Sequence, residues 1–427
     1  MTDSNDAREG APSTAGTFGQ LIAILAGAFA LQIAGAALGL VVPLRMALDG
    51  RPAALIGLTA SANAIGFLIG CMSAAHFVRP IGHIRAFAVL AAVQAILTQI
   101  FALTEDPWLW AALRFANGAV NAGQFVIIES WVNDRAPDTM RGRIMAIYMV
   151  CSRAGLILGQ MMPLAFTGAD ASEALFVAAS AFYSLALIPV ALNRAPSPAT
   201  PALTRLPLRE LYAVAPVSIV ACFYVGFVGS TVVNVLPLYG VGIGLSTAWI
   251  SVFAAALQFG SLAVQWPLGL LSDRQDRRSV MIGGALGAII GGLIVAFAPK
   301  MPTILLATVI ALGIGAAQSV YAIAVAHAFD FAGRDRTVGL SSGLMLTWGV
   351  GAATGPLVAA AAIDRFGPGG LFIHAAVFSL AFAGFAVWRM TQRSPVPPAE
   401  REKFVDVPAT SPASAKLDPR TEKVDQT

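Results

Sequence analysis

The sequence has little charge for its length. Only 12% of its 427 residues are Asp, Glu, Lys or Arg, whereas an ordinary soluble domain carries about twice that share. Hydrophobic residues make up 57% of the chain, and its mean hydropathy is +0.74. Apolar stretches of about 20 residues recur, each long enough to cross a hydrocarbon core about 30 Å thick. These features predict an all-α protein that crosses a membrane several times; the short alternating segments of a membrane barrel are missing.

Cysteine and recognisable catalytic motifs are also scarce. Cys71, Cys151 and Cys222 lie far apart inside apolar segments, without the spacing of metal ligands. We expect buried thiols that pack as small apolar groups, and no disulfide framework. The sequence shows no P-loop, no nucleophile elbow and no metal-ligand cluster. It therefore predicts no enzyme, no cofactor, no metal site and no ATP-driven mechanism, and its net charge of +4 gives no reason to expect nucleic acid.

The apolar runs divide into two sets. The first run, Phe18–Val42, is too long for a secretory signal and follows acidic residues, so we interpret it as a membrane span. Twelve spans can be drawn, over residues 18–43, 54–78, 84–103, 108–131, 143–166, 172–192, 212–238, 247–271, 279–298, 302–328, 339–362 and 370–389. We predict a cytoplasmic tail, an N-terminal six-helix half, a Pro-rich basic linker, a C-terminal six-helix half and a disordered cytoplasmic tail, over residues 1–17, 18–192, 193–211, 212–389 and 390–427.

Basic residues set the predicted orientation. Loops after odd-numbered spans hold only Arg45, Arg51, Lys300 and Arg365. Loops after even-numbered spans hold many more, namely Arg79, Arg85, Arg135, Arg141, Arg143, Arg194, Arg205, Arg209, Arg274, Arg277, Arg278, Arg334 and Arg336. Because Lys and Arg are enriched in cytoplasmic loops, we expect both termini in the cytoplasm.

The two halves repeat each other at an offset of about 195 residues. The segment VVPL ending at Leu44 matches VLPL ending at Leu238, and Asp134 matches Asp330. Parallel repeats of six helices, with a solute site near the bilayer midplane between them, are a transporter architecture.

Several motifs resemble those of the major facilitator superfamily (MFS) of transporters. GLLSDRQDRR, from Gly269, is similar to the family's cytoplasmic loop signature G-x-x-x-D-R-x-G-R-R, with Asp276 in place of the second Gly. RFANG at 114–118 is similar to R-x-x-[QN]-G, and spans five and eleven carry G-x-x-x-G-[QP]. ESWVNDRAP at 129–137 resembles a bacterial subgroup with many uncharacterised members. The resemblance implies the MFS fold with twelve transmembrane helices, the inner membrane, and a monomeric carrier of a small solute; proton coupling is implied by the resemblance alone.

Charged residues in the cytoplasmic loops predict a gate. An alternating-access protein needs contacts that close one side in one state and release it in the other, and charge-assisted hydrogen bonds at the water interface suit this task. The resemblance implies the same role. The candidates are Arg79, Glu129, Asp134, Arg141 and Arg143 in the N-terminal half, and Asp273, Arg274, Arg277, Arg278, Asp330, Arg334 and Arg336 in the C-terminal half. The alternative is that these charges are solvated and only set the topology.

Polar residues inside the spans predict a cavity. On span four a polar stripe about 80° wide consists of Arg114, Asn117, Asn121 and Gln124. Such a stripe cannot face lipid. On span five, Arg153 lies ten residues after Arg143, about 15 Å deep, and Gln160 shares its face. The candidates in the C-terminal half are Gln258, Gln318, Tyr321 and Trp348. Close helix packing is expected at Gly155, Gly159, Gly351, Gly355 and Pro356.

Acidic residues are missing from the middle of every predicted span. Arg114 and Arg153 therefore have no carboxylate at their own depth, and an unpaired buried cation is unfavourable. A bound solute with anionic or carbonyl-rich groups would relieve this. Two alternatives remain open, an interhelical hydrogen-bond network without solute contact and an arginine bound to backbone carbonyls.

We therefore predict a secondary active transporter for a small neutral or anionic organic solute, such as an organic acid, a sugar-like compound or a vitamin such as riboflavin. An efflux antiporter for drugs or metabolites is the first alternative. The G-x-x-x-G-[QP] segments favour it, and the lack of a mid-membrane carboxylate disfavours it for cationic drugs. A non-transporting membrane sensor or scaffold is the second alternative, but it would normally carry an added soluble domain.

Overall fold

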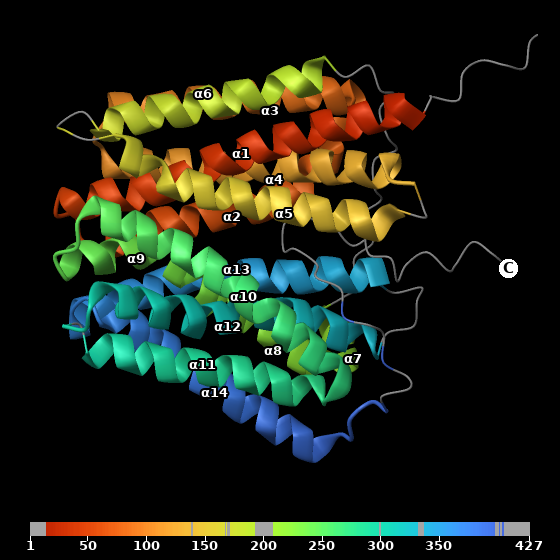
Figure 1. Ribbon diagram of the computed structural model, residues 1–427, viewed down its shortest axis with the longest axis vertical. Coiled ribbons are helices and arrows are strands. Elements are labelled where there is room, and N and C mark those ends of the chain that lie inside the picture. Colours follow the sequence, from red (N-terminus) through yellow and green to blue (C-terminus); the bar gives the residue numbers. More distant parts are fainter. Residues whose placement is uncertain are drawn as a thin grey trace, which may run out of the picture.

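The computed structural model describes residues 14–137, 140–166, 168, 171–192, 208–298, 300–331, 337–397, 401 and 404. The regular structure of these residues is helical (Figure 1). The N-terminal half contains α1 (Thr14–Leu48), α2 (Ala53–Ile81), α3 (His83–Leu103), α4 (Pro107–Arg135), α5 (Arg141–Met161), the 3-10 turn η2 (Met162–Ala165) and α6 (Ala171–Ala191). The C-terminal half contains α7 (Leu208–Val214), α8 (Pro216–Tyr224), the π-helical turn η3 (Val225–Ser230), α9 (Thr231–Gly242), α10 (Thr247–Arg274), α11 (Arg277–Phe297), α12 (Thr303–Phe329), α13 (Thr337–Phe366) and α14 (Gly370–Gln392).

Most helices fit a membrane-spanning length. Within the described ranges, eleven helical segments are long and apolar enough to cross a membrane, with Pro216–Gly242 counting as one segment. The 29-residue helix α4 is not among them. Its polar side chains are nevertheless inside the protein, since Arg114, Asn117 and Gln124 are all buried. Packing against neighbouring helices thus hides the polarity of α4 from the surroundings.

The seventh predicted span begins later than expected. The sequence placed its start at residue 212, but the chain leaves the helical conformation at Ala215, with φ −140° and ψ 67°. Pro216 follows, and a proline disfavours the helical conformation in the residue before it. The short helix α7 is therefore separate from α8, and it covers residues that the sequence analysis gave to the linker. The rest of that linker, residues 193–207, lies outside the described residues.

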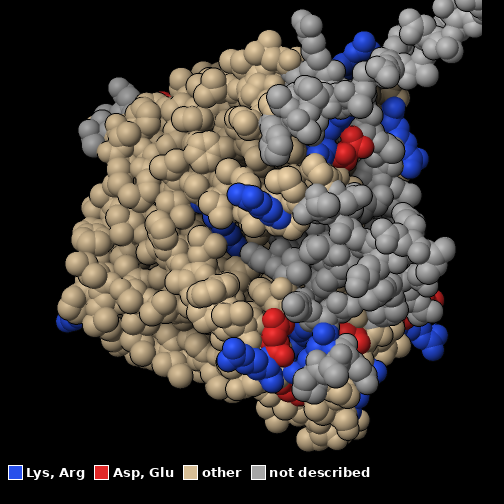
Figure 2. All heavy atoms as spheres, turned by 45° about the vertical axis from the view of Figure 1, so that its right-hand side comes forward, with Lys and Arg blue, Asp and Glu red and all other residues tan. Residues whose placement is uncertain are grey.

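Helix α1 starts and helix α14 ends at the same end of the bundle, on the right in Figure 1. We call it the terminal end, and the other the opposite end. Figure 2 shows charged side chains gathered toward the terminal end, while the side of the bundle visible in this view is almost wholly uncharged. This distribution is typical of a bundle whose middle lies in lipid.

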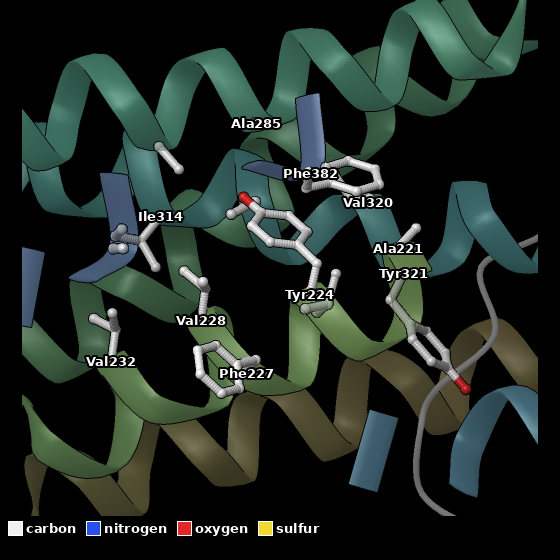
Figure 3. Close-up of a cluster of buried hydrophobic side chains, with 14 of the residues drawn as sticks. Ala221, Tyr224, Phe227, Val228, Val232, Ala285, Ile314, Val320, Tyr321 and Phe382 are labelled. Atoms are coloured by element: carbon white, nitrogen blue, oxygen red, sulfur yellow. The ribbon is translucent and has the colours of Figure 1, made fainter. Parts of the chain in front are cut away.

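Each half has its own buried apolar core. In the N-terminal half the core includes Ile24, Phe87 and Trp131. In the C-terminal half it surrounds the α8–η3–α9 segment (Figure 3), where the rings of Tyr224 and Phe382 stack with centroids 4.7 Å apart. Two separate cores allow each half to move as a rigid unit.

The halves meet at the opposite end. Leu40 and Leu44 of α1 belong to the core of the C-terminal half. In return, Leu238 and Val241 of α9 pack against the core of the N-terminal half. These four side chains, which we call the apolar seam, close the space between the halves at this end.

Glycines allow close helix contacts at matching places in the two halves. A Cβ on Gly118 of α4 would collide with the backbone of Asn63 in α2, and a Cβ on Gly315 of α12 would lie 2.6 Å from the backbone of Gly260 in α10. The pair α2–α4 thus packs like the pair α10–α12, as expected for two copies of one repeat.

The glycines singled out by the sequence face neighbouring helices. A Cβ on Gly155 or Gly159 would meet α1, and a Cβ on Gly351 or Gly355 would meet the α8–η3 segment. The carbonyl oxygen of Pro356 lies 2.7 Å from where a Cβ on Gly57 of α2 would stand, so this residue is at a contact between the halves.

Gly159→Ala is expected to destabilise the protein by about 1–3 kcal/mol, because the added methyl overpacks the α1–α5 contact. The new Cβ would meet the Ala36 Cβ at 2.8 Å and the backbone of Ile33. Gly384→Ala is the matched control, because nothing lies within 4 Å of its Cβ position and alanine favours a helix. Thermal unfolding in detergent compares the two variants. Equal melting temperatures would contradict the close contact at Gly159.

Candidate functional site: a polar cavity between the two halves

A cavity of about 370 Å³ lies between the two halves. One wall comes from α1, α2, α4 and α5, and the other from η3, α9, α10, α12 and α13. Its volume is in the range of small-molecule sites in proteins. Both halves therefore contribute to one central site.

The cavity brings together nine of the ten residues that the sequence analysis placed in a cavity. They are Arg114, Asn117, Asn121, Arg153, Gln160, Gln258, Gln318, Tyr321 and Trp348. Gln124 is the exception: it is fully buried outside the lining, and no hydrogen-bond partner is assigned to its amide atoms within the described part of the chain. It stands at the edge of the polar stripe on α4, so its side chain packs between helices.

Other lining residues were missed. The lining also contains residues that were not predicted from the sequence, namely Gln32, Asn63, Phe67, Phe125, Tyr148 and Ser152. A lone amide inside an apolar span, as at Asn63, is a usable signal because such residues seldom face lipid. The π-helical turn was also missed, and Val225, Gly229 and Ser230 from it line the cavity. Turns of this kind occur often at functional sites.

Charge in the cavity has one sign. Arg114 and Arg153 are in the lining, and no Asp or Glu is found among the described lining residues. Arg114 is only 4% exposed. Arg153 forms a hydrogen bond with an amide of the lining: its Nη1 donates to Oε1 of Gln258 across 2.9 Å. The described lining therefore carries the positive charge of two arginines and no acidic side chain.

Several amide and hydroxyl groups of the lining lack a partner. Within the described residues, no hydrogen bond is assigned to Oδ1 of Asn63, Nδ2 of Asn117, Oγ of Ser152, Oε1 of Gln160 or Nε2 of Gln318. Burying such a group without a hydrogen bond is unfavourable. A polar solute or water in the cavity could supply the missing bonds.

Aromatic rings form another part of the wall. The ring of Phe67 on α2 meets those of Phe125 on α4 and Trp348 on α13 edge to face, at centroid distances of 6.3 and 6.4 Å. Tyr321 of α12 also lines the cavity, and its ring points away from the stacked pair Tyr224–Phe382 in Figure 3. The wall can therefore contact a planar group as well as polar ones.

A buried tyrosine supports the α4 side of the cavity. The hydroxyl of Tyr183 on α6 accepts a hydrogen bond of 3.0 Å from Nε2 of Gln94. Arg114 and Asn117 are its electrostatic neighbours, and the hydroxyl lies 3.6 Å from where a Cβ on Gly35 would stand. Tyr183 thus lies behind the lining and holds part of it in place.

Tyr183→Phe is expected to weaken solute binding by about 1 kcal/mol, since it removes the hydrogen bond from Gln94 that holds Tyr183 beside Asn117 and Arg114. Tyr224→Phe is the matched control, because its hydroxyl pairs with Ser379 at 2.8 Å in the core of the other half. Ligand titrations followed by thermal shift measure both variants. Equal losses of affinity would contradict a supporting role for Tyr183.

Four of the predicted gate residues of the C-terminal half form ion pairs, namely Asp273, Arg277, Arg278 and Asp330. Arg277 pairs with Asp330 at 2.7 Å and with Asp273 at 3.6 Å. Arg278 pairs with Asp276 at 2.8 Å. We expected these arginines at the water interface, but their side chains are only 1% and 3% exposed. They are buried because two segments cover them. The end of α12 covers Arg277, which donates a hydrogen bond to Asp330. The chain after α14 covers Arg278, which donates a hydrogen bond to the carbonyl of Arg393.

Asp276 illustrates the strength of these ion pairs. Burial alone would raise the pKa of its carboxyl group, but the hydrogen bonds and the charge of Arg278 outweigh burial and hold that pKa below its usual value. Asp276 therefore stays ionised and caps the start of α11, where it accepts from the Arg278 backbone N–H at 3.0 Å.

Comparison with known proteins gives the family. The family model described as Major Facilitator Superfamily matches residues 24–274 and again residues 249–422. The chain belongs to the major facilitator superfamily. An uncharacterised MFS-type transporter of Yersinia enterocolitica is 26% identical over 371 residues, which cover 85% of this chain and 94% of the relative. The uncharacterised MFS-type transporter YcaD of Escherichia fergusonii is 25% identical over 363 residues, covering 84% of this chain and 93% of the relative. With its many apolar helices, this MFS protein is a multi-pass protein of the bacterial inner membrane.

Solved structures share the MFS fold. The nucleoside transporter NupG has a TM-score of 0.71 at 14% identity, covering 88% of this chain and 100% of that one. A bacterial homologue of the lysosomal transporter Spinster, in an inward-facing and unoccupied conformation, has a TM-score of 0.73 at 14% identity, covering 92% of this chain and 100% of that one.

In this MFS protein the N-terminal gate candidates are arranged differently from expectation. Glu129 is fully buried and accepts a hydrogen bond of 3.0 Å from the hydroxyl of Tyr148, so it does not lie at the water interface. Asp134 contacts Arg135 at 3.4 Å. The exposed candidates are Arg79, Asp134, Arg143 and, in the other half, Arg274. The side chains of Arg141, Arg334 and Arg336 lie outside the described residues.

The described chain after α14 contacts the loop that holds the C-terminal gate candidates. Its described residues are 393–397, 401 and 404, within the segment that we expected to be a disordered tail. The backbone N–H of Phe404 donates to Oδ1 of Asp273 at 2.9 Å, and its ring lies 2.5 Å from where a Cβ on Gly269 would stand. Arg393 stacks over the Phe331 ring at 3.9 Å. The signature glycine and aspartate of the MFS loop thus contact the chain's own C-terminal segment.

Proposed function

We propose that this MFS protein is a secondary active transporter that carries a small neutral or anionic organic solute by alternating access. The observation that carries the proposal is the cavity, whose described lining holds Arg114, Arg153 and several amides but no carboxylate. Solute sites of such carriers lie between six-helix repeats, near mid-membrane. Positive charge in this lining favours an oxyanion or a carbonyl group and repels an organic cation.

We infer that α4 is the twelfth membrane-crossing helix and that the terminal end is cytoplasmic. Packing supports the first point, because Arg114, Asn117 and Asn121 of α4 line the cavity and Gly118 packs closely against α2. Charge supports the second, because the loops at the terminal end hold most of the interhelical Lys and Arg. The protein would thus have two six-helix halves and both termini in the cytoplasm.

The apolar seam supports an inward-facing state. It closes the outer end of the proposed solute path, so a solute reaches the cavity from the cytoplasmic side. In the alternate state the seam opens and the cytoplasmic loops meet. In the proposed cycle the ion pairs of Arg277 hold the loops of the C-terminal half in shape. Substitutions in these ion pairs slow transport but do not alter which solute is carried.

Among the candidate solutes, organic acids suit the two arginines better than sugar-like compounds or riboflavin do. The solved MFS neighbours include a D-xylose–proton symporter, at a TM-score of 0.67. Proton coupling in this protein would need a group outside the described lining. Glu129 is a candidate for such a group, since its partner Tyr148 lines the cavity.

Efflux remains the second candidate function. The G-x-x-x-G segments that favour it are used here for helix packing against α1 and α8–η3. They are therefore no guide to the direction of transport, which has to be measured.

Transport assays test the proposal. A thermal-shift screen of organic acids, sugars, amino acids, riboflavin and cationic dyes first selects ligands, and proteoliposomes with purified protein then measure their uptake and exchange. We expect saturable exchange of a stabilising acid that is lost in Arg153→Ala. Ligands that bind but are never exchanged would favour the sensor or scaffold alternative.

A further inference from the structure

A hydrogen bond joins the two halves across the cavity. It is the bond of 2.9 Å from Arg153 on α5 to the amide oxygen of Gln258 on α10. Both residues line the cavity, and Gln258 is only 4% exposed. A cavity arginine of one half is thus held by a neutral oxygen atom of the other half.

An amide oxygen is a modest partner for a guanidinium group. Hydrogen bonds to ionised groups are about twice as strong as bonds between neutral groups. A two-oxygen anion can also meet the planar fork of arginine with two parallel bonds. No described lining residue supplies such an anion. An oxyanion that enters the cavity would therefore displace Gln258 from Arg153.

We propose that Oε1 of Gln258 occupies the position on Arg153 that a carboxylate or similar oxyanion of the solute takes when the solute binds. The inference rests on the proposed function in one respect, that this cavity is the solute site. It narrows the solute to organic anions. The rings of Phe67, Tyr321 and Trp348 in the same lining add a surface for a planar body next to the oxyanion.

The exchange links binding to movement. While Arg153 holds Gln258, α5 and α10 are tied together across the cavity. A ligand shifts a conformational equilibrium only by binding one state more tightly than the other. Here the anion binds Arg153 fully only after Gln258 has left, so solute binding favours the state in which the tie between the halves is broken.

The test uses three substitutions on α10 in the full-length protein. Gln258→Glu fixes a carboxylate against Arg153, and Gln258→Ala removes the amide. Gln265→Glu is the matched control, because Gln265 also lines the cavity and lies two turns along the same helix face. The probes are benzoate with benzamide, nicotinate with nicotinamide, and lactate with lactamide. Each pair has nearly the same shape and differs in charge, and thermal-shift titrations give the affinities.

We expect the wild-type protein to bind at least one carboxylate more tightly than its amide. Gln258→Glu should weaken that binding at least about tenfold more than Gln265→Glu does, and Gln258→Ala should keep or strengthen it. A wild-type protein that prefers none of the carboxylates overturns the proposal. Equal losses in the two Glu variants overturn it too, because they would reflect only the added charge.

Uptake into proteoliposomes separates this inference from the proposed function. Carboxylate binding in the expected order without any uptake contradicts transport and supports the role of Gln258. Uptake of a neutral solute that is unaffected by Gln258→Glu supports transport and contradicts the role of Gln258.

Discussion

Replacing Arg277 with alanine is expected to lower the stability of the protein more than any other single change in its charged loops. The side chains of Arg277 and Asp330 are each 1% exposed and lie 2.7 Å apart. Removal of one partner leaves the other charge buried without it, which costs about 3–5 kcal/mol. Thermal unfolding in detergent should show a correspondingly large fall in melting temperature.

Two variants decide whether the cause is the unpaired charge. The double variant Arg277→Met with Asp330→Leu should recover most of the loss, because apolar side chains can replace a buried ion pair. Arg274→Ala is the control on the same loop, since Arg274 is exposed and a surface charge contributes less than about 1 kcal/mol. A double variant as unstable as Arg277→Ala would contradict this explanation.

Arg153→Ala is expected to reduce the affinity for an anionic solute by about 2–5 kcal/mol, the usual effect of truncating one side of a buried charged hydrogen bond. The reason is that its guanidinium is the charged group of α5 in the cavity lining. Thermal-shift titrations measure the loss: a ligand at 100 times its dissociation constant stabilises the folded protein by about 2.7 kcal/mol, and this shift should disappear in the variant.

Arg143→Ala is the matched control for Arg153→Ala, because Arg143 is exposed near the start of the same helix. It should keep the ligand-induced shift. Stabilisation by cationic dyes that is equal in wild type and Arg153→Ala would contradict an anionic solute and favour efflux of cations.

The sequence predicted the helical membrane fold and nine of the residues that line the cavity. These features follow from local patterns: a run of apolar residues predicts a span, and the spacing of Arg114, Asn117 and Asn121 predicts a common face. Gln124 shows the limit of such reasoning. Periodicity gives the direction of a side chain but not the helix that lies in that direction, and a residue at the edge of a polar face can be covered.

Contacts between distant segments could not be predicted. The partner of Arg153 lies 105 residues away in the other half, so no local spacing indicates it. Glu129 lies near the end of α4, where solvent is the usual environment, yet Tyr148 of the next helix covers it. The hydrogen bond from Phe404 to Asp273 likewise joins parts of the chain that are 131 residues apart. The π-helical turn had a weak signal in the glycines of VGFVGS, because glycine disfavours regular helix.

The apolar seam has a consequence for how the two states of the protein are populated. The seam involves four aliphatic side chains, Leu40, Leu44, Leu238 and Val241, which join the margins of the two cores. Burial of one such side chain contributes about 1.5–3 kcal/mol, and about 1.4 kcal/mol changes an equilibrium tenfold. One substitution in the seam can therefore shift the ratio of inward- to outward-facing protein by an order of magnitude. Evolution could thus adjust the resting state of this carrier while the residues that contact the solute remain the same.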